Sequence, residues 1–179
     1  LTISFGSPNR DLVTLSLEEE KIIQKSIAKN FLQNQAGKMF IVSNPTDKDI
    51  FVFNEGEPTQ GIQITEENLE TKTQNHNTTG RINQAFLDNN NMPVFLLDFN
   101  KLYFTKNKKI VNLNPNHQHK KIISIQKESI VLVDSKGKIL TYKNTDNAPL
   151  INQTKSLFEN KNIQELTVFT NQNTTYMSA

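Results

Sequence analysis

Hydrophobic and polar residues alternate over short segments along most of the chain, and this pattern predicts β-strands. Successive side chains of a strand point to opposite faces, so a half-buried strand shows a period of two. Short apolar runs bounded by turn residues are also typical of buried strands. The predicted strands are LTISF, KMFIVSN, DIFVFN and GIQIT in the first half, and PVFLLDF, KLYFT, KKIVNL, KIISI, SIVLVD, KILTY and ELTVFT in the second. DLVTL is a second short apolar segment, which follows a turn after LTISF.

One segment, residues 16–36, shows helical spacing instead. Ser16 and Glu19 match a capping box, in which the two side chains satisfy backbone donors at a helix start. Ile23, Ile27 and Phe31 recur every four residues and form an apolar stripe. Two shorter helices are predicted at residues 82–89 and 150–158. The predicted fold class is therefore α+β: mostly antiparallel β, with one clear N-terminal amphipathic helix and a small β-barrel-like or meander C-terminal half.

The chain divides, by its pattern of elements, near a polar segment at residues 66–81. This segment is rich in Asn and Thr and has few apolar positions, which is typical of a loop or a domain boundary. We predict a first domain of helix and strands over residues 1–75 and an antiparallel β subdomain over residues 82–179. One continuous domain with a mobile loop at 66–81 is the alternative.

The composition of the chain excludes several kinds of functional site. The 179 residues contain no cysteine, which excludes disulfides, thiolate metal sites and cysteine nucleophiles. No stretch approaches the ~18 apolar residues of a transmembrane helix. The formal net charge is only +2 at pH 7, so nucleic acid is not the expected partner. The absence of cysteine fits an oxidising compartment, and we expect an exported protein, periplasmic or extracellular.

The stretch KKIISIQKESIVLVDSKGKILTY reads as strand, turn, strand, glycine turn and strand. Over residues 100–143 this order resembles the periplasmic homology-region domain of type II secretion clamp proteins and type IV pilus lipoproteins. The resemblance rests on Ile122 or Ile123, Ile125, the Ile130–Leu132 strand and Gly137. The Gly-Asp dipeptide that this family usually carries before its central loop is absent. SIVLVDSKGKILTY is also similar to a propeller-blade hairpin of the chromosome-condensation-regulator type, although that family's Trp-Gly pairs are absent. We weight the first resemblance above the second.

Few residues suggest catalytic chemistry. His117 and His119 are the one paired-histidine feature, and on a strand both would share a face and reach one metal ion. No third ligand is evident, so an exposed loop is the favoured interpretation and a metal-assisted enzyme the weaker alternative. The acidic residues close enough in sequence to form catalytic pairs lie in polar turns and at a predicted helix start, where carboxylates usually cap or are solvated; they are Asp47, Asp49, Glu66, Glu67 and Glu70. We expect no enzyme activity and no cofactor.

A basic strip at residues 101–121 is the more informative feature. It holds six lysines, two histidines and no acidic residue. We predict a non-enzymatic protein-binding or assembly module, an exported bacterial envelope component of secretion, pilus or motility machinery, whose partner is another protein of an envelope complex. Binding of a ligand or nucleic acid by the same strip is the alternative, and lysines that protect a sheet edge are the structural interpretation. The predicted partner-binding residues are Tyr103, Phe104, Lys106, Lys108 and Lys109.

Overall fold

The computed structural model describes residues 2–6, 11–18, 21–28, 38–43, 49–54, 59–65, 71–126, 129–143, 151–156, 167–171 and 174–178. The chain divides into two compact units, Leu1–Asn77 and Thr78–Ala179. All the secondary structure in the described residues is β-strand, and every sheet is antiparallel. The boundary between the units falls within the segment 66–81, of which Thr71–His76 form strand β7.

Unit 1 contains two sheets. A three-stranded sheet is formed by β1 (Thr2–Gly6), β2 (Asp11–Glu18) and β3 (Lys21–Ala28). A four-stranded sheet is formed in chain order by β4 (Met39–Ser43), β5 (Asp49–Asn54), β6 (Thr59–Thr65) and β7. Phe51, Val52 and Phe53 of β5 are all buried, so both faces of this central strand are shielded from water. This burial explains the continuous apolar run of β5.

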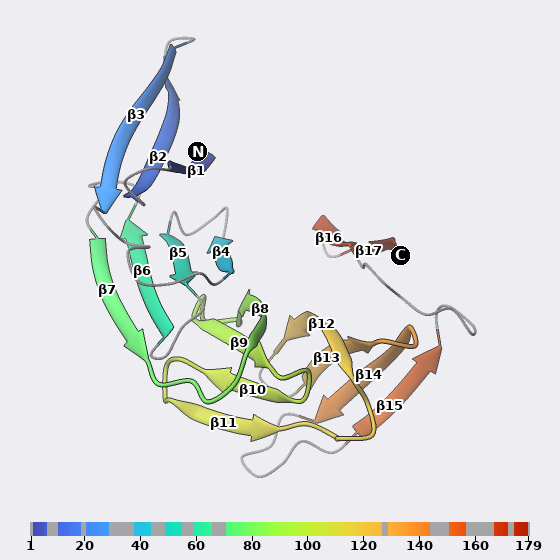
Figure 1. Cartoon of the computed structure of the whole chain (residues 1–179). Coiled ribbons are helices and arrows are strands. Elements are labelled where there is room, and N and C mark those ends of the chain that lie inside the picture. The colour runs from blue at the N-terminus through green and yellow to red at the C-terminus, as the bar shows by residue number, and fades with distance from the viewer. Residues whose placement is uncertain are drawn as a thin grey trace. The chain divides into compact units, whose positions relative to one another are not determined.

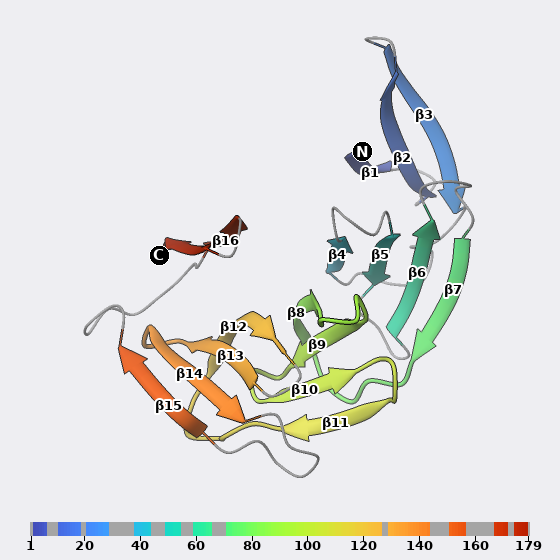
Figure 2. The same cartoon turned by 180° about the vertical axis from the view of Figure 1, so that it is seen from behind.

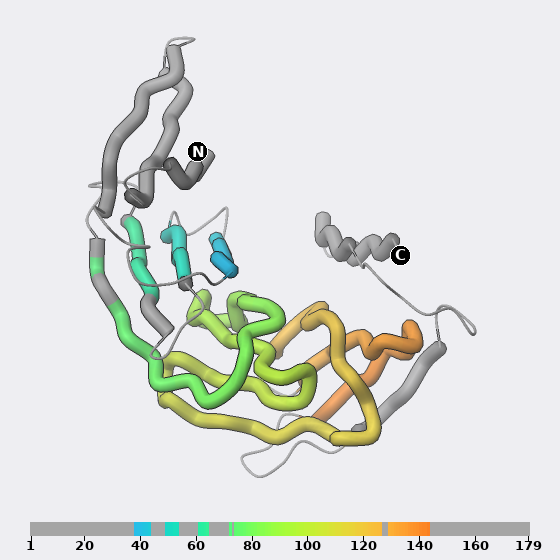
Figure 3. Tube along the Cα trace, viewed as in Figure 1, coloured from blue at the N-terminus to red at the C-terminus, as the bar shows by residue number. Residues whose placement is uncertain are grey.

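Unit 2 contains two four-stranded meanders like that of β4–β7. Figure 1 shows these two sheets as separate sets of arrows. The first sheet contains β8 (Ile82–Leu87), β9 (Pro93–Leu97), β10 (Lys101–Phe104) and β11 (Lys109–Asn112). The second contains β12 (His119–Ile125), β13 (Ser129–Asp134), β14 (Lys138–Lys143) and β15 (Ile151–Ser156). A separate hairpin contains β16 (Thr167–Asn171) and β17 (Thr174–Ser178). Figure 3 traces the backbone through β8 to β12 and through β13 to β14 in chain order.

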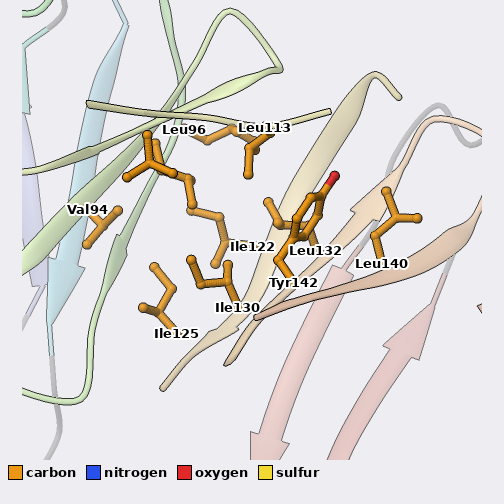
Figure 4. Close-up of a cluster of buried hydrophobic side chains, with 11 residues drawn as sticks. Val94, Leu96, Leu113, Ile122, Ile125, Ile130, Leu132, Leu140 and Tyr142 are labelled. Carbon is orange, nitrogen blue, oxygen red and sulfur yellow. The ribbon is translucent and has the colours of Figure 1, made fainter. Parts of the chain in front are cut away.

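The two four-stranded sheets of unit 2 share one hydrophobic core. The core cluster takes Val94, Leu96, Leu102, Val111 and Leu113 from the first sheet and its following loop, and Ile122, Ile125, Ile130, Leu132, Leu140 and Tyr142 from the second. Figure 4 shows these side chains gathered between the strands, with the Tyr142 ring among the leucines. Burial of a Leu or Ile side chain stabilises a fold by about 1.5–3 kcal/mol, so this shared core holds the two sheets together.

Gln84 adds a polar link between the first strands of these sheets. Its Oε1 accepts a 2.6 Å hydrogen bond from the Ile122 N–H, and its Nε2 donates a 3.4 Å bond to the Ile122 carbonyl. The pairing of β8 with β9 shifts register between Ile82 and Gln84, and that of β12 with β13 shifts between Ile122 and Ser124. Each sheet therefore has a bulge in its first strand, and Gln84 joins the two irregular positions.

The prediction of an α+β fold is wrong, because the predicted helices are strands wherever the structure describes them. Residues 16–18 belong to β2 and residues 21–28 to β3, and Ser16 pairs with Ile23; residues 19–20 and 29–36 lie outside the described residues. A spacing of four residues is even, so it fits one face of a strand as well as one face of a helix. The shorter predicted helices coincide with β8 and β15, each paired to a neighbouring strand.

The strands predicted from the alternating pattern are confirmed as strands, namely β1, β4, β5, β6, β9, β10, β11, β12, β13, β14 and β16. The second half is not one closed barrel in the described residues, but consecutive antiparallel meanders. Both views of the cartoon, Figure 1 and Figure 2, show the strands of each meander in chain order. Repeated four-stranded antiparallel sheets are the building unit of β-propellers.

Candidate functional site

Four connecting segments of unit 2 meet at one end of its two sheets, and we call this the aspartate end. It consists of Gly80–Arg81, the β9–β10 turn Asp98–Asn100, the β11–β12 connection Leu113–Gln118, and the β13–β14 turn Asp134–Gly137. Backbone hydrogen bonds join these segments. They run from Asp98 N to Arg81 O (3.0 Å), from Leu113 N to Asn100 O (2.7 Å), from His119 N to Phe99 O (2.9 Å) and from Ser135 N to Gln118 O (2.8 Å).

At this end of each of the two sheets, an aspartate side chain forms hydrogen bonds to the segment that precedes the first strand. Asp98 Oδ1 accepts a 2.9 Å bond from the Arg81 N–H, just before β8. Asp134 Oδ2 lies 2.9 Å from His117 Nδ1, just before β12. Asp134 Oδ1 also accepts the N–H groups of Lys136 (2.9 Å) and Lys138 (2.8 Å), which fixes the glycine turn between β13 and β14. Each aspartate therefore ties the end of the second strand of its sheet to the residue or segment that precedes the first strand.

The β9–β10 turn is strained. Asp98 and Phe99 have φ values of 47° and 61°, and Asn100 N donates a 3.0 Å bond to Leu97 O. Two successive positive φ values are typical of a type I′ turn, in which Asn, Asp and Gly are usual, so Phe99 is the unusual residue. The Phe99 N–H donates a 2.7 Å bond to Asn83 Oδ1, so the bulged residue of β8 holds the strained turn in place.

His119 and Tyr142 form a buried hydrogen-bond chain beneath the aspartate end. His119 Nδ1 lies 2.8 Å from the Phe99 carbonyl, and His119 Nε2 lies 2.6 Å from the Tyr142 hydroxyl. A carbonyl only accepts, so Nδ1 carries the proton, and the hydroxyl must then donate to Nε2. Both side chains are fully shielded from solvent. The histidine is therefore neutral and oriented by two partners.

Burial also sets the titration of this pair. Desolvation lowers the pKa of His119, and the neighbouring His117 lowers that pKa further, whereas the Phe99 carbonyl and Asp134 act in the opposite direction. Desolvation raises the pKa of Tyr142 to about 12, against a smaller opposite effect of the Asn114 backbone. Both groups stay uncharged at neutral pH, which is typical of structural groups in a core.

The predicted histidine pair does not come together as a metal site. The His117 and His119 rings lie 6.2 Å apart between centroids and are tilted by 50°. Both ring nitrogens of His119 are engaged in hydrogen bonds, and a metal ion on this ring would displace the Phe99 carbonyl or the Tyr142 hydroxyl. Within the described residues, no three or more His, Cys, Asp or Glu residues are grouped so that they could hold a metal ion.

The fold divides the basic strip predicted at residues 101–121. Strand β10 begins at Lys101 and ends at Phe104, so the β9–β10 turn and the β10–β11 turn lie at opposite ends of this strand. Lys101 and Lys120 are at or next to the aspartate end, whereas Lys106, Lys108 and Lys109 are at the other end. The strip is thus two separate basic surfaces.

The structure places the five predicted partner-binding residues in different environments. Lys106 and Lys108 are exposed in the β10–β11 turn, and Lys109 is half-buried at the start of β11. Tyr103 is only 2% exposed and its ring stacks against Phe95, so its ring does not form part of a surface. Phe104 packs against the core cluster. Asp49, from the predicted carboxylate pairs, accepts a 2.8 Å bond from the Gln63 amide; Asp47, Glu66, Glu67 and Glu70 lie outside the described residues.

Sequence reasoning missed Ile110, one of two large hydrophobic residues that are exposed in the described part of the chain. Ile110 is 39% exposed and lies on β11, the edge strand of its sheet. The alternating pattern contained a signal, since Ile110 and Val111 are adjacent and only one of them can face the core. The lysines of residues 101–121 predicted a protected sheet edge, but the sequence did not show which strand forms it.

Comparison with known proteins gives no match, either to a protein-family model or to a curated protein. In the part of the chain that the structure describes, no helix has the length and apolar character needed to cross a bilayer.

Proposed function

We propose that the chain is a non-enzymatic protein-binding module that engages a partner protein along the edge of strand β11. Consecutive four-stranded meanders supply a rigid scaffold, as blades do in β-propellers. The histidine, aspartate and tyrosine groups that offered chemistry are engaged in internal hydrogen bonds, which supports a structural role for them. The location in the bacterial envelope is proposed from the sequence alone.

The observation that carries the proposal is the exposed Ile110 on an edge strand. In the described residues β11 pairs with β10 and with no further strand. A partner segment that adds to such an edge gains main-chain hydrogen bonds, and an exposed side chain gives an apolar contact. Exposed lysines 106 and 108 in the adjacent turn would favour an acidic segment.

A site-specific photocrosslinker tests this surface. We expect a crosslinkable residue at position 110 to capture one defined partner in cells of the source organism, and the same residue at exposed position 118 to capture none. Because the Ile110 side chain is exposed, Ile110→Lys should leave the fold intact. With the crosslinker moved to a neighbouring exposed position, this variant should capture less of the partner. Capture that is equal at positions 110 and 118, or that is unchanged by Ile110→Lys, would contradict the proposal.

A matched pair of double variants tests the contribution of charge. Lys106→Glu with Lys108→Glu should weaken binding to the captured partner by about tenfold or more, equal to about 1.4 kcal/mol. Lys136→Glu with Lys138→Glu makes the same charge change at a glycine turn on the aspartate end and should leave the affinity unchanged. Equal losses in both variants would mean that net charge, and not the β11 edge, controls the interaction.

A further inference from the structure

Positive charge is concentrated in unit 2. Residues 78–143 carry eleven of the twenty Lys and Arg residues but only four of the eighteen Asp and Glu residues. The rest of the chain carries nine basic and fourteen acidic residues. The net charge of +2 therefore averages an acidic part and a strongly basic part, and it gives no measure of the field around unit 2.

Part of this charge is brought together at the aspartate end. Lys101 follows the β9–β10 turn, Lys120 lies at the start of β12, and Lys136 and Lys138 flank Gly137 in the β13–β14 turn. The backbone hydrogen bonds between Phe99 and His119 and between Gln118 and Ser135 hold these elements side by side. Residues distant in the sequence thus form one basic surface.

The carboxylates at this end leave most of that charge uncompensated. Asp134 is 1% exposed and accepts bonds from His117 and from the N–H groups of Lys136 and Lys138. Only the backbone of the two lysines takes part, so their side chains are not held by this aspartate. Asp98 is exposed and pairs with Lys101, whose Nζ lies 3.5 Å from Oδ2.

The surface chemistry indicates which partner fits. Exposed large hydrophobic residues in the described part of the chain are Ile41 and Ile110, and neither lies at the aspartate end. Protein interfaces need apolar or aromatic anchors and are depleted in lysine. Lysines with the exposed amides of Asn116 and Gln118 instead suit phosphate oxygens, which accept bonds from Lys, Asn and Gln side chains.

We propose that the aspartate end binds the phosphodiester backbone of nucleic acid without reading its sequence. The one aromatic ring in the β9–β10 turn, Phe99, is covered by the Lys120 ammonium group at 5.1 Å from the ring centroid, so no open stacking platform for bases is present among the described side chains of this turn. Lysine, a point charge, holds phosphate without the fork geometry that reads bases. This proposal is independent of the β11 edge.

Fluorescence anisotropy with the whole chain tests the proposal, with a labelled oligothymidine and a mixed-sequence duplex as probes. We expect both probes to bind at low salt, with affinity falling steeply as salt rises. Lys136→Gln with Lys138→Gln should weaken binding and reduce the salt slope by about 2, since each lost phosphate contact reduces it by about 1. The matched control, Lys106→Gln with Lys108→Gln, should keep the slope. Thermal melting checks that both variants are folded.

Three outcomes would overturn the proposal. Absence of binding to either probe at low salt would show that the surface does not hold phosphate. Equal effects of the two double variants would show attraction to diffuse charge and not to the aspartate end. Competition by poly-glutamate as effective as that by unlabelled oligonucleotide would assign the surface to an acidic protein.

Discussion

The Tyr142 hydroxyl donates a 2.6 Å hydrogen bond to Nε2 of His119, and both side chains are fully buried. This bond joins β14 to β12, while the other ring nitrogen of the histidine joins β12 to the strained turn between β9 and β10. Two strands of one sheet and a turn of the other sheet therefore share a single imidazole.

Removing the Tyr142 hydroxyl should destabilise the fold. Tyr142→Phe leaves the His119 Nε2 buried without its donor, and an unsatisfied buried group costs about 1–3 kcal/mol. Urea denaturation measures the loss as a lower midpoint with an unchanged slope. A double-mutant cycle with His119→Gln should give a coupling energy of about 0.5–3 kcal/mol. Strictly additive effects would show that the bond contributes nothing.

Stability should fall as the pH falls below neutrality. The pKa of His119 lies below its ordinary value of 6.5 in the folded chain, because burial disfavours the imidazolium. Between the folded pKa and 6.5 the unfolded chain binds more protons, so the free energy of unfolding decreases with decreasing pH by at most about 1.4 kcal/mol per unit. Well above 6.5 the histidine is neutral in both states and contributes no pH dependence.

The variant His119→Gln isolates this contribution in urea denaturation at several pH values. The groups that face the imidazole, Asp134, His117 and Tyr142, are kept in the variant. The wild type should lose more stability than the variant between pH 6.5 and the folded pKa. Parallel profiles would mean that His119 does not titrate as a buried neutral group.

Two glycines should respond differently to substitution. A Cβ at Gly80 would lie 2.2 Å from Asp98 Oδ2, and the φ of +129° is a conformation that side chains rarely adopt. Gly80→Ala should cost about 1–3 kcal/mol from backbone strain, with the steric clash in addition. Gly137 has a φ of 73°, close to the left-handed region that Asn tolerates, so Gly137→Asn should cost less. Thermal melting of both variants measures the difference, and equal losses would contradict it.

The link between the sheets should depend on Gln84. Gln84→Leu removes both hydrogen bonds to the Ile122 backbone. The buried N–H of Ile122 then has lost its Gln84 acceptor, and this lowers the free energy of unfolding by about 1–3 kcal/mol. Hydrogen exchange should become faster at Ile122 in particular. The control is Gln118→Leu on the exposed connection, which should leave exchange at Ile122 unchanged. Unaltered protection at Ile122 in Gln84→Leu would count against the link.

Prediction from the sequence succeeded where a strand carries its own signal. SIVLVD and KILTY alternate or run apolar between turn residues, and both are strands in the structure. The apolar spacing of residues 16–28 fitted a helix and a strand equally, and the pairing of β2 with β3 decided between them. A regular alternation in β12 would place Ile123 and Ile125 on the same face; the bulge instead buries Ile122 and Ile125 and leaves Ile123 half-buried.

The candidate site depended even more on tertiary contacts. The pair His117 and His119 was visible in the sequence, but the acceptors and donors that engage them, Asp134, Phe99 and Tyr142, are far apart along the chain. The basic strip was also visible, but not its division between two ends of β10.

The sequence by itself determined where most strands form and which reactive residue types are absent, because alternation and composition are local properties of the chain. The tertiary structure alone decided which strands are edges, where bulges shift the inward face, and which polar groups are buried with partners. These features depend on contacts between segments that are distant in the sequence. The energy of such a contact depends on both segments, so it does not follow from the residues of either one alone.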